Sequence, residues 1–147
     1  MEDSDFLIEW AVWVNLDSYK NTELILLKGH LFLEQVIELT LSRHGIVDYE
    51  NDSFYKKILS LEEGLKSNDS FGLQIVGFLK SVNKIRNKLA HEHTFQFPNK
   101  ETELWVQKVL ASCKGEKFSR FTFKSELVHA FSILSVNVLK MKLLKDE

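Results

Sequence analysis

Only one proline and six glycines occur among the 147 residues, and this scarcity constrains the fold more than any other feature of the chain. Tight turns depend on these two residue types, so the chain has few places to reverse direction and should form few, long elements. Apolar residues recur at steps of three and four along most of the sequence, which is the period of an amphipathic helix. We therefore predict an all-α, up-and-down bundle of five to six helices in one domain spanning residues 1–147.

The helical period covers six segments, separated by short polar breakers: 6–14, 24–41, 54–65, 71 to about 91, 100–113 and 125–144. The first five are preceded by candidate N-caps, namely Ser4 or Asp5; Asp17, Ser18 or Asn21; Asp52 or Ser53; Asp69 or Ser70; and Asn99. We predict that the second helix is central, because leucines and isoleucines occur on nearly all of its sides. Phe95 and Phe97 precede the single proline, Pro98, and should fold back on the bundle in a short extended stretch.

Two features near the C-terminus allow more than one interpretation. Aromatic and polar residues alternate from Phe118 to Phe123, which could form a brief extended strand. The last helix has a seven-residue apolar repeat, which fits either a core helix of the bundle or a dimer-forming zipper. The residues of that repeat are Leu127, Phe131, Leu134, Val138 and Met141.

Charge and cysteine content limit the classes of function. The formal net charge of −2 gives no overall basic field, so any contact with RNA must be a local patch. The single cysteine, Cys113, excludes an intramolecular disulfide and cysteine-rich zinc modules, and it favours a reduced intracellular compartment. The sequence begins Met-Glu-Asp-Ser-Asp, unlike a signal peptide, and has no apolar run of membrane-spanning length. We expect a soluble, cytoplasmic protein with no membrane partner.

The segment from Leu79 to His93 is unusual because a cation borders its apolar stripe. Arg86 lies four residues after Val82, at the edge of the face that should pack on the core. A guanidinium there needs a partner. Glu34, which lies among apolar residues of the second helix, could pair with Arg86 across the helix interface, or could reach water as a boundary carboxylate.

Arg86, Asn87 and His91 could border one cleft. His91 follows Arg86 by five residues, which separates the two by about 140° around the helix and about 7.5 Å along it. Small and amide residues lie between them, including Asn83 and Ala90, and would allow another helix to approach closely.

The segment Ile-Arg-Asn-Lys-Leu-Ala-His-Glu resembles the signature of the HEPN superfamily, in which a histidine follows an arginine by a few residues. Arg86, Asn87 and His91 match this signature. The segment from Lys28 to Gln35 also resembles the mannitol operon repressor branch (MtlR-like), and the resemblance covers roughly Glu23 to His93. It implies a small, commonly dimeric helical bundle, and in many members a metal-independent ribonuclease whose cleft contains the Arg and His of both protomers.

The chemistry of RNA cleavage matches these residue types. Cleavage without metal needs a group that accepts the 2′-hydroxyl proton, and positive charge where the phosphorane becomes negative. His91 suits the first task and Arg86 the second, while Asn87 could orient the imidazole or donate to phosphate. Lys80, Lys84 and Lys88 form an i, i+4, i+8 row that would attract an RNA backbone, although a solvated helix face looks the same.

A structural interpretation of the same residues is also open. Arg86 could join the helices through Glu34, and His91 could be a cation favoured by the C-terminal end of the helix dipole. His30, His44 and His129 fit positions at the core edge or the surface. We expect no metal site at His91 and His93, because no suitable acidic or cysteine partner accompanies them, and we find no motif for a cofactor.

Three functional hypotheses follow from the sequence. The first is a dimeric HEPN-type endoribonuclease, a toxin or phage-defence effector that an antitoxin could accompany. The second is a non-catalytic regulatory module that acts through protein contacts, as the MtlR-like resemblance implies. The third is a nucleotide-binding accessory to a nucleotidyltransferase partner.

Overall fold

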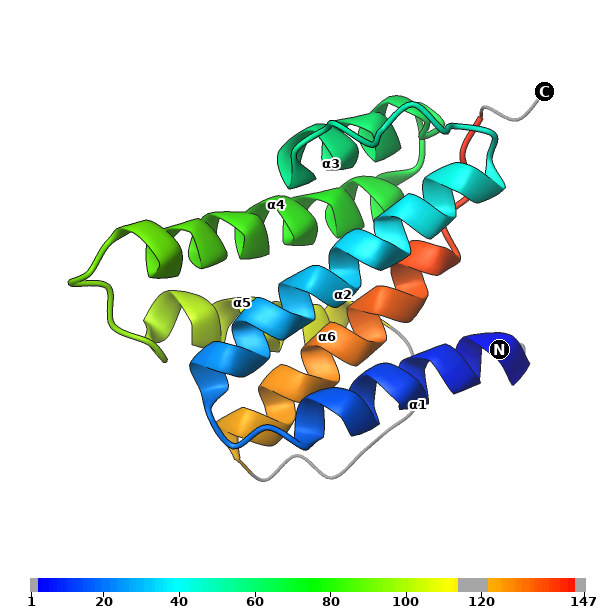
Figure 1. The fold of residues 1–147 in the computed structure, drawn as a ribbon. Coiled ribbons are helices and arrows are strands. Elements are labelled where there is room, and N and C mark those ends of the chain that lie inside the picture. Colours follow the sequence, from blue (N-terminus) through cyan, green and yellow to red (C-terminus); the bar gives the residue numbers. More distant parts are fainter. Residues whose placement is uncertain (1–2, 114–121, 145–147) are drawn as a thin grey trace.

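Six helices make up the described part of the chain in this computed structural model, which covers residues 3–113 and 122–144 (Figure 1). They are α1 (Asp3–Asp17), α2 (Thr22–Arg43), α3 (Phe54–Glu63), α4 (Ser70–His91), α5 (Lys100–Ser112) and α6 (Phe123–Leu139). No strand occurs among these residues. The prediction of an all-α bundle with five to six helices is therefore confirmed.

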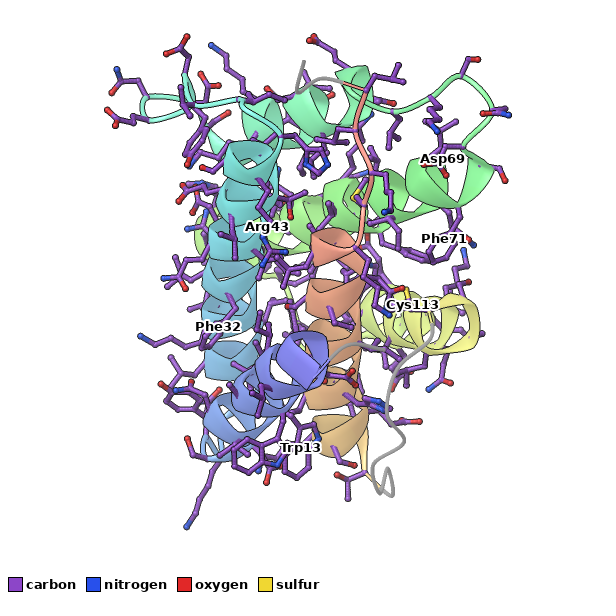
Figure 2. The ribbon with its side chains drawn as sticks, turned by 90° about the vertical axis from the view of Figure 1, so that its right-hand side faces the viewer. Trp13, Phe32, Arg43, Asp69, Phe71 and Cys113 are labelled. Atoms are coloured by element: carbon purple, nitrogen blue, oxygen red, sulfur yellow. The ribbon has the colours of Figure 1, made fainter. Side chains whose placement is uncertain are left out.

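The centre of the bundle is α6, which contacts α1, α2, α4 and α5. Figure 2 shows α2 and α6 side by side. Every residue of α6 from Leu127 to Leu139 is buried, including Ser132 and Ser135. Their hydroxyls donate to backbone carbonyls one turn earlier, His129 O at 3.0 Å and Phe131 O at 2.7 Å, so they enter the core without leaving a donor unpaired.

This arrangement refines one prediction and decides between the two interpretations of the last helix. The second helix does have neighbours on several faces, since α2 contacts α1, α3, α4 and α6, but α6 is the more deeply buried helix, because α2 has an exposed face that includes Leu31 and Leu39. All five residues of the seven-residue repeat are buried inside the chain, so α6 is a core helix and the zipper interpretation is wrong. The predicted extended segment lies mostly in residues 114–121, outside the described residues; Thr122 has extended backbone angles and Phe123 already begins α6.

Helix starts follow the capping chemistry of the sequence. The side chains of Asn21, Ser53, Asp69 and Asn99 each accept a hydrogen bond from a backbone N–H in the first turn of α2, α3, α4 and α5. Thr122 and Ser125 form a reciprocal capping box at the start of α6, which had no N-cap candidate in the sequence.

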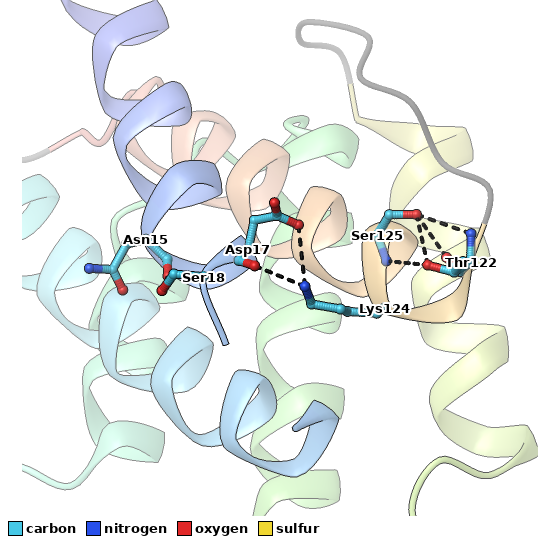
Figure 3. A network of polar contacts seen from close by, with 6 residues as sticks. All are labelled: Asn15, Asp17, Ser18, Thr122, Lys124 and Ser125. Atoms are coloured by element: carbon cyan, nitrogen blue, oxygen red, sulfur yellow. Dashed lines mark hydrogen bonds and ion pairs between the residues drawn. The ribbon is translucent and has the colours of Figure 1, made fainter. Parts of the chain in front are cut away.

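The C-terminal end of α1 contacts the start of α6 (Figure 3). The Lys124 ammonium donates to the backbone oxygen of Asp17 at 2.8 Å and lies 3.6 Å from its carboxylate. A cation at the C-terminal end of α1 also interacts favourably with the helix dipole. This contact fixes the N-terminal helix against the central helix.

The loop before α5 packs on the bundle as predicted. Phe95 and Phe97 are partly buried against the core, and the ring of Phe97 lies edge-on to that of Phe123 with centroids 6.1 Å apart. None of the described helices is both long and apolar enough to span a bilayer.

Candidate functional site

All of the predicted catalytic and RNA-binding residues border one groove on the outer side of α4. It consists of two adjoining depressions, of ≈ 550 and ≈ 410 Å³, which share Tyr55, Asn83 and Asn87. Each volume lies within the usual range of small-ligand sites. We call this surface the α4 groove; α4 contributes to it Lys80, Asn83, Lys84, Arg86, Asn87, Lys88 and His91, and α2 and α3 supply the opposite wall.

The apolar stripe of α4 determines which residues face the groove. Ile75, Leu79 and Val82 pack in the core on one side of the helix. Lys84, Asn87 and His91 recur at steps of three and four on the outer side, so they project in similar directions. His91 is the last residue of α4 and is exposed, so its imidazole lies at the open end of the groove.

Arg86 is half-buried, and one of its guanidinium nitrogens donates to Asn87 Oδ1 at 3.3 Å. The predicted ion pair between Glu34 and Arg86 does not form. Glu34 instead accepts from the Lys57 ammonium at 2.8 Å. The remaining nitrogens of Arg86 have no hydrogen-bond or carboxylate partner in residues 3–113 and 122–144, although the same depression contains both Arg86 and Glu34.

The position of α3 explains why Glu34 pairs with Lys57. The side chain of Lys57 is only 5% exposed and reaches Glu34 at 2.8 Å and Glu38 at 2.5 Å, two carboxylates that are one turn apart on α2. Burial alone would lower the pKa of Lys57, but the hydrogen bonds to both carboxylates outweigh it, and the pKa is raised. The sequence could not show that α3 brings a lysine closer to Glu34 than α4 brings its arginine.

His30 is a groove residue to which sequence analysis assigned no role. It is buried, its Nε2 lies 3.1 Å from Asn83 Oδ1, and its ring stacks on Phe54 with centroids 3.9 Å apart. Burial lowers the pKa of His30, and the nearby Arg86 lowers it further, against opposing effects of Asn83 and Glu34. His30 is therefore neutral at pH 7. A carboxamide oxygen only accepts hydrogen bonds, so Nε2 donates in this contact.

These contacts leave the polar floor of the groove rich in donors. Asn83 Oδ1 accepts from His30, and Asn87 Oδ1 accepts from Arg86. The side-chain NH₂ groups of both asparagines have no acceptor among the described residues. Together with the remaining N–H groups of Arg86, they can bind a ligand rich in acceptor oxygens, such as a phosphate.

The lysine row is only partly free. Lys80 pairs with Glu62 at 3.1 Å, and Lys88 pairs with Glu101 at 3.1 Å. Lys84 is exposed and has no carboxylate within 4 Å in the described parts of the chain. An anionic ligand would therefore interact most directly with Lys84 and Arg86 and would compete with glutamates for the other two lysines.

Neither a metal site nor a reactive thiol is supported by the described residues. In the described residues, no three side chains of His, Cys, Asp or Glu are grouped as metal ligands would be. Cys113 is buried, and burial raises the pKa of its thiol to about 12, so it is not a nucleophile at neutral pH.

Comparison of the chain with models of protein families, with curated proteins and with solved structures gives no match. The HEPN resemblance therefore remains a prediction based on the residues quoted above.

Proposed function

We propose that this protein binds RNA in the α4 groove and cleaves it without a metal ion, as a HEPN-type endoribonuclease. The observation that supports this most is that a guanidinium and two asparagine NH₂ groups border one depression, and that the same two asparagines also border the adjoining depression, which contains an exposed imidazole. This set contains donors for a phosphate and an imidazole that can accept a proton.

The proposed reaction is an internal transesterification. His91 accepts the proton of a ribose 2′-hydroxyl, and the 2′-oxygen forms a bond to phosphorus while the bond from phosphorus to the 5′-oxygen breaks. Arg86 and the NH₂ group of Asn87 donate to the phosphoryl oxygens, where negative charge increases in the transition state. The 5′-oxygen takes up a proton from the imidazolium or from water. The products are a 2′,3′-cyclic phosphate and a 5′-hydroxyl end.

One chain holds the whole proposed set of groups. The HEPN resemblance implies a cleft shared by two protomers, but Arg86 and His91 line adjoining depressions of a single chain, and Asn87 lines both. We therefore propose that a second copy is not needed for the chemistry. Mixing Arg86→Ala with His91→Ala protein tests this point, because a shared cleft would recover activity in mixed dimers and a single-chain site would not.

Matched variants test the enzymatic proposal. Purified protein is incubated with an end-labelled single-stranded RNA and with the same DNA sequence in the presence of EDTA, and the 3′ ends of the products are identified. We expect cleavage of RNA alone, with a loss of about 10²-fold or more in rate for His91→Ala and for Arg86→Ala. His93→Ala and Arg43→Ala are the controls, because both residues are exposed and lie outside the groove lining.

The controls also define failure. Wild type that leaves RNA intact would overturn the proposal, and so would cleavage that all four variants retain equally, because that points to a contaminating nuclease. DNA cleavage at the same rate would exclude the 2′-hydroxyl as the nucleophile.

The non-catalytic regulatory module is the second candidate, and the ion pairs of the groove favour it. Lys80 and Lys88 are already bound by glutamates, and His91 lies at the C-terminal end of α4, where the helix dipole favours a cation. These residues would then stabilise the bundle and a protein-binding surface. This candidate predicts that Arg86→Ala lowers the melting temperature while the wild type has no effect on RNA.

A further inference from the structure

A second groove lies between α4 and α5. In Figure 1, α5 lies on the opposite side of α4 from α3. The floor of this groove consists of the largely buried side chains of Phe78, Ile85 and Trp105. The indole N–H of Trp105 donates to the backbone oxygen of Phe78 at 3.0 Å, so the one polar atom of this floor is already paired. The groove therefore offers an apolar surface to an incoming side chain.

Polar contacts close the groove at both ends. Gln74 donates to Ser112 at 3.1 Å near the start of α4, and Lys88 pairs with Glu101 at 3.1 Å near its end. Figure 2 shows the same antiparallel arrangement, with Asp69 and Phe71 at the start of α4 and Cys113 just after α5. Gln74 and Lys88 are separated by about 21 Å along the helix, which matches the length of a helix such as α5, about 20 Å.

The exposed edge of α5 is complementary to itself. Leu104 projects from it with 49% of its surface exposed, and Glu101 and Lys108 lie three and four residues to either side. If a second α5 packs antiparallel across a two-fold axis near Leu104, each Glu101 faces the Lys108 of the other copy. Two such ion pairs form around an apolar centre, as an isologous interface requires.

The wall of α4 has space for the projecting leucine. A Cβ atom added at Gly77 would meet no atom within 4 Å, so this glycine faces open space. Glycine in a helix interior is unfavourable relative to alanine, and packing within the chain does not require it here. The hollow at Gly77 can accept Leu104 of a second copy.

We propose that the groove between α4 and α5 is a homodimer interface, in which α5 of a second copy packs antiparallel with reciprocal Glu101–Lys108 pairs and Leu104 seated against Gly77. This interface is separate from the α4 groove and leaves that groove open. The two surfaces adjoin at Lys88, whose partner Glu101 belongs to the interface.

Sedimentation velocity over a range of protein concentrations tests the proposal, with circular dichroism to confirm that each variant is folded. Lys108→Glu should weaken dimerisation by at least about tenfold, because each substitution acts twice in a symmetric interface. Lys108 has no ion pair with any described residue, so its reversal breaks no contact within the chain. The triple variant Lys88→Glu, Glu101→Lys and Lys108→Glu should restore dimerisation, since the pairs between copies and the Lys88–Glu101 pair within the chain all form again with exchanged signs.

Glutamate substitutions at two exposed leucines test whether a dimer uses this interface or another surface. Leu104→Glu should give a monomer, whereas Leu73→Glu, a change at a residue of similar exposure outside the groove lining, should remain dimeric. A wild type that is monomeric at every concentration would overturn the proposal. A dimer that tolerates Leu104→Glu would overturn it as well, and so would a failure of the triple charge exchange to restore dimerisation.

Discussion

Substitution of alanine for Gly29 or for Gly77 tests the packing of the bundle, because Gly29 is crowded by a neighbouring helix and Gly77 faces open space. A Cβ atom at Gly29 of α2 would lie 2.6 Å from ring carbons of Phe131 in α6, whereas a Cβ atom at Gly77 meets nothing within 4 Å. Ordinary carbon–carbon contacts are about 3.5–4.0 Å. The ring of Phe131 is fully buried and lies 5.3 Å from that of Trp105, so it has little room to move away.

The expected free energies of unfolding follow from these distances. Alanine is favoured over glycine by about 1 kcal/mol in a helix interior, and overpacking a core costs about 1–3 kcal/mol. The 2.6 Å approach to a fully buried ring places the cost at Gly29 in the upper part of the overpacking range, about 2–3 kcal/mol, so Gly29→Ala should destabilise the protein by a net of about 1–2 kcal/mol. Gly77→Ala should stabilise it by about 0.5–1 kcal/mol. In a domain of this size the first change lowers the melting temperature by about 3–6 °C.

Urea unfolding at low protein concentration, where a dimer dissociates, measures both variants. Equal effects of the two substitutions would refute the close approach of α2 to α6 at Gly29. A third measurement strengthens the test: Phe131→Leu should cost less stability in the Gly29→Ala background than in the wild type, because the smaller side chain relieves the contact.

Three further predictions concern titratable side chains. The double variant Glu34→Gln with Glu38→Gln leaves the buried ammonium of Lys57 without a carboxylate, whereas Lys57→Met removes that buried charge. The double variant should therefore lower the free energy of unfolding in urea more than Lys57→Met does. The lowered pKa of His30 means that the unfolded chain binds a proton more readily than the folded chain, so stability should fall as the pH drops below 6.5. That fall should be at most about 1.4 kcal/mol per pH unit for one proton, and His30→Gln should reduce the pH dependence of urea unfolding. The Cys113 thiol should react with a disulfide reagent at pH 8 only after unfolding, because burial raises its pKa to about 12; rapid labelling of the native protein would contradict its buried position.

Local chemistry made the starts of α2 to α5 predictable, whereas α1 already includes Ser4 and Asp5, and α6 begins after Thr122 and ends at Leu139. Asn21 and Asn99 are capping residues wherever a helix follows them, because their side chains satisfy N–H groups of the same short segment. The side of α4 on which each polar residue projects was equally predictable. The buried apolar stripe fixes the orientation of the helix, and with it the direction of all remaining side chains. Asn87 lines both of the adjoining depressions on this side of α4, while Arg86 lines one and His91 the other, so the single cleft expected from the spacing stays a prediction.

Contacts between helices were not predictable in this way. The partner of Glu34 depends on which helix packs against α2, and a single sequence does not specify that choice. The burial of α6 on all sides was also hidden, because Ser132 and Ser135 resemble a solvated face until their bonds to the backbone of their own helix are known. The sequence placed His30 only at the core edge or the surface, because its contact is with Asn83, 53 residues further along the chain.

Incubation of the purified wild type and its His91→Ala and His93→Ala variants with labelled RNA in EDTA tests the proposed function most directly. We expect the wild type and His93→Ala to release fragments that end in a 2′,3′-cyclic phosphate, and we expect His91→Ala to release almost none. RNA that stays intact with the wild type, or that His91→Ala cleaves as fast as His93→Ala does, would contradict the assignment of the α4 groove as a ribonuclease site.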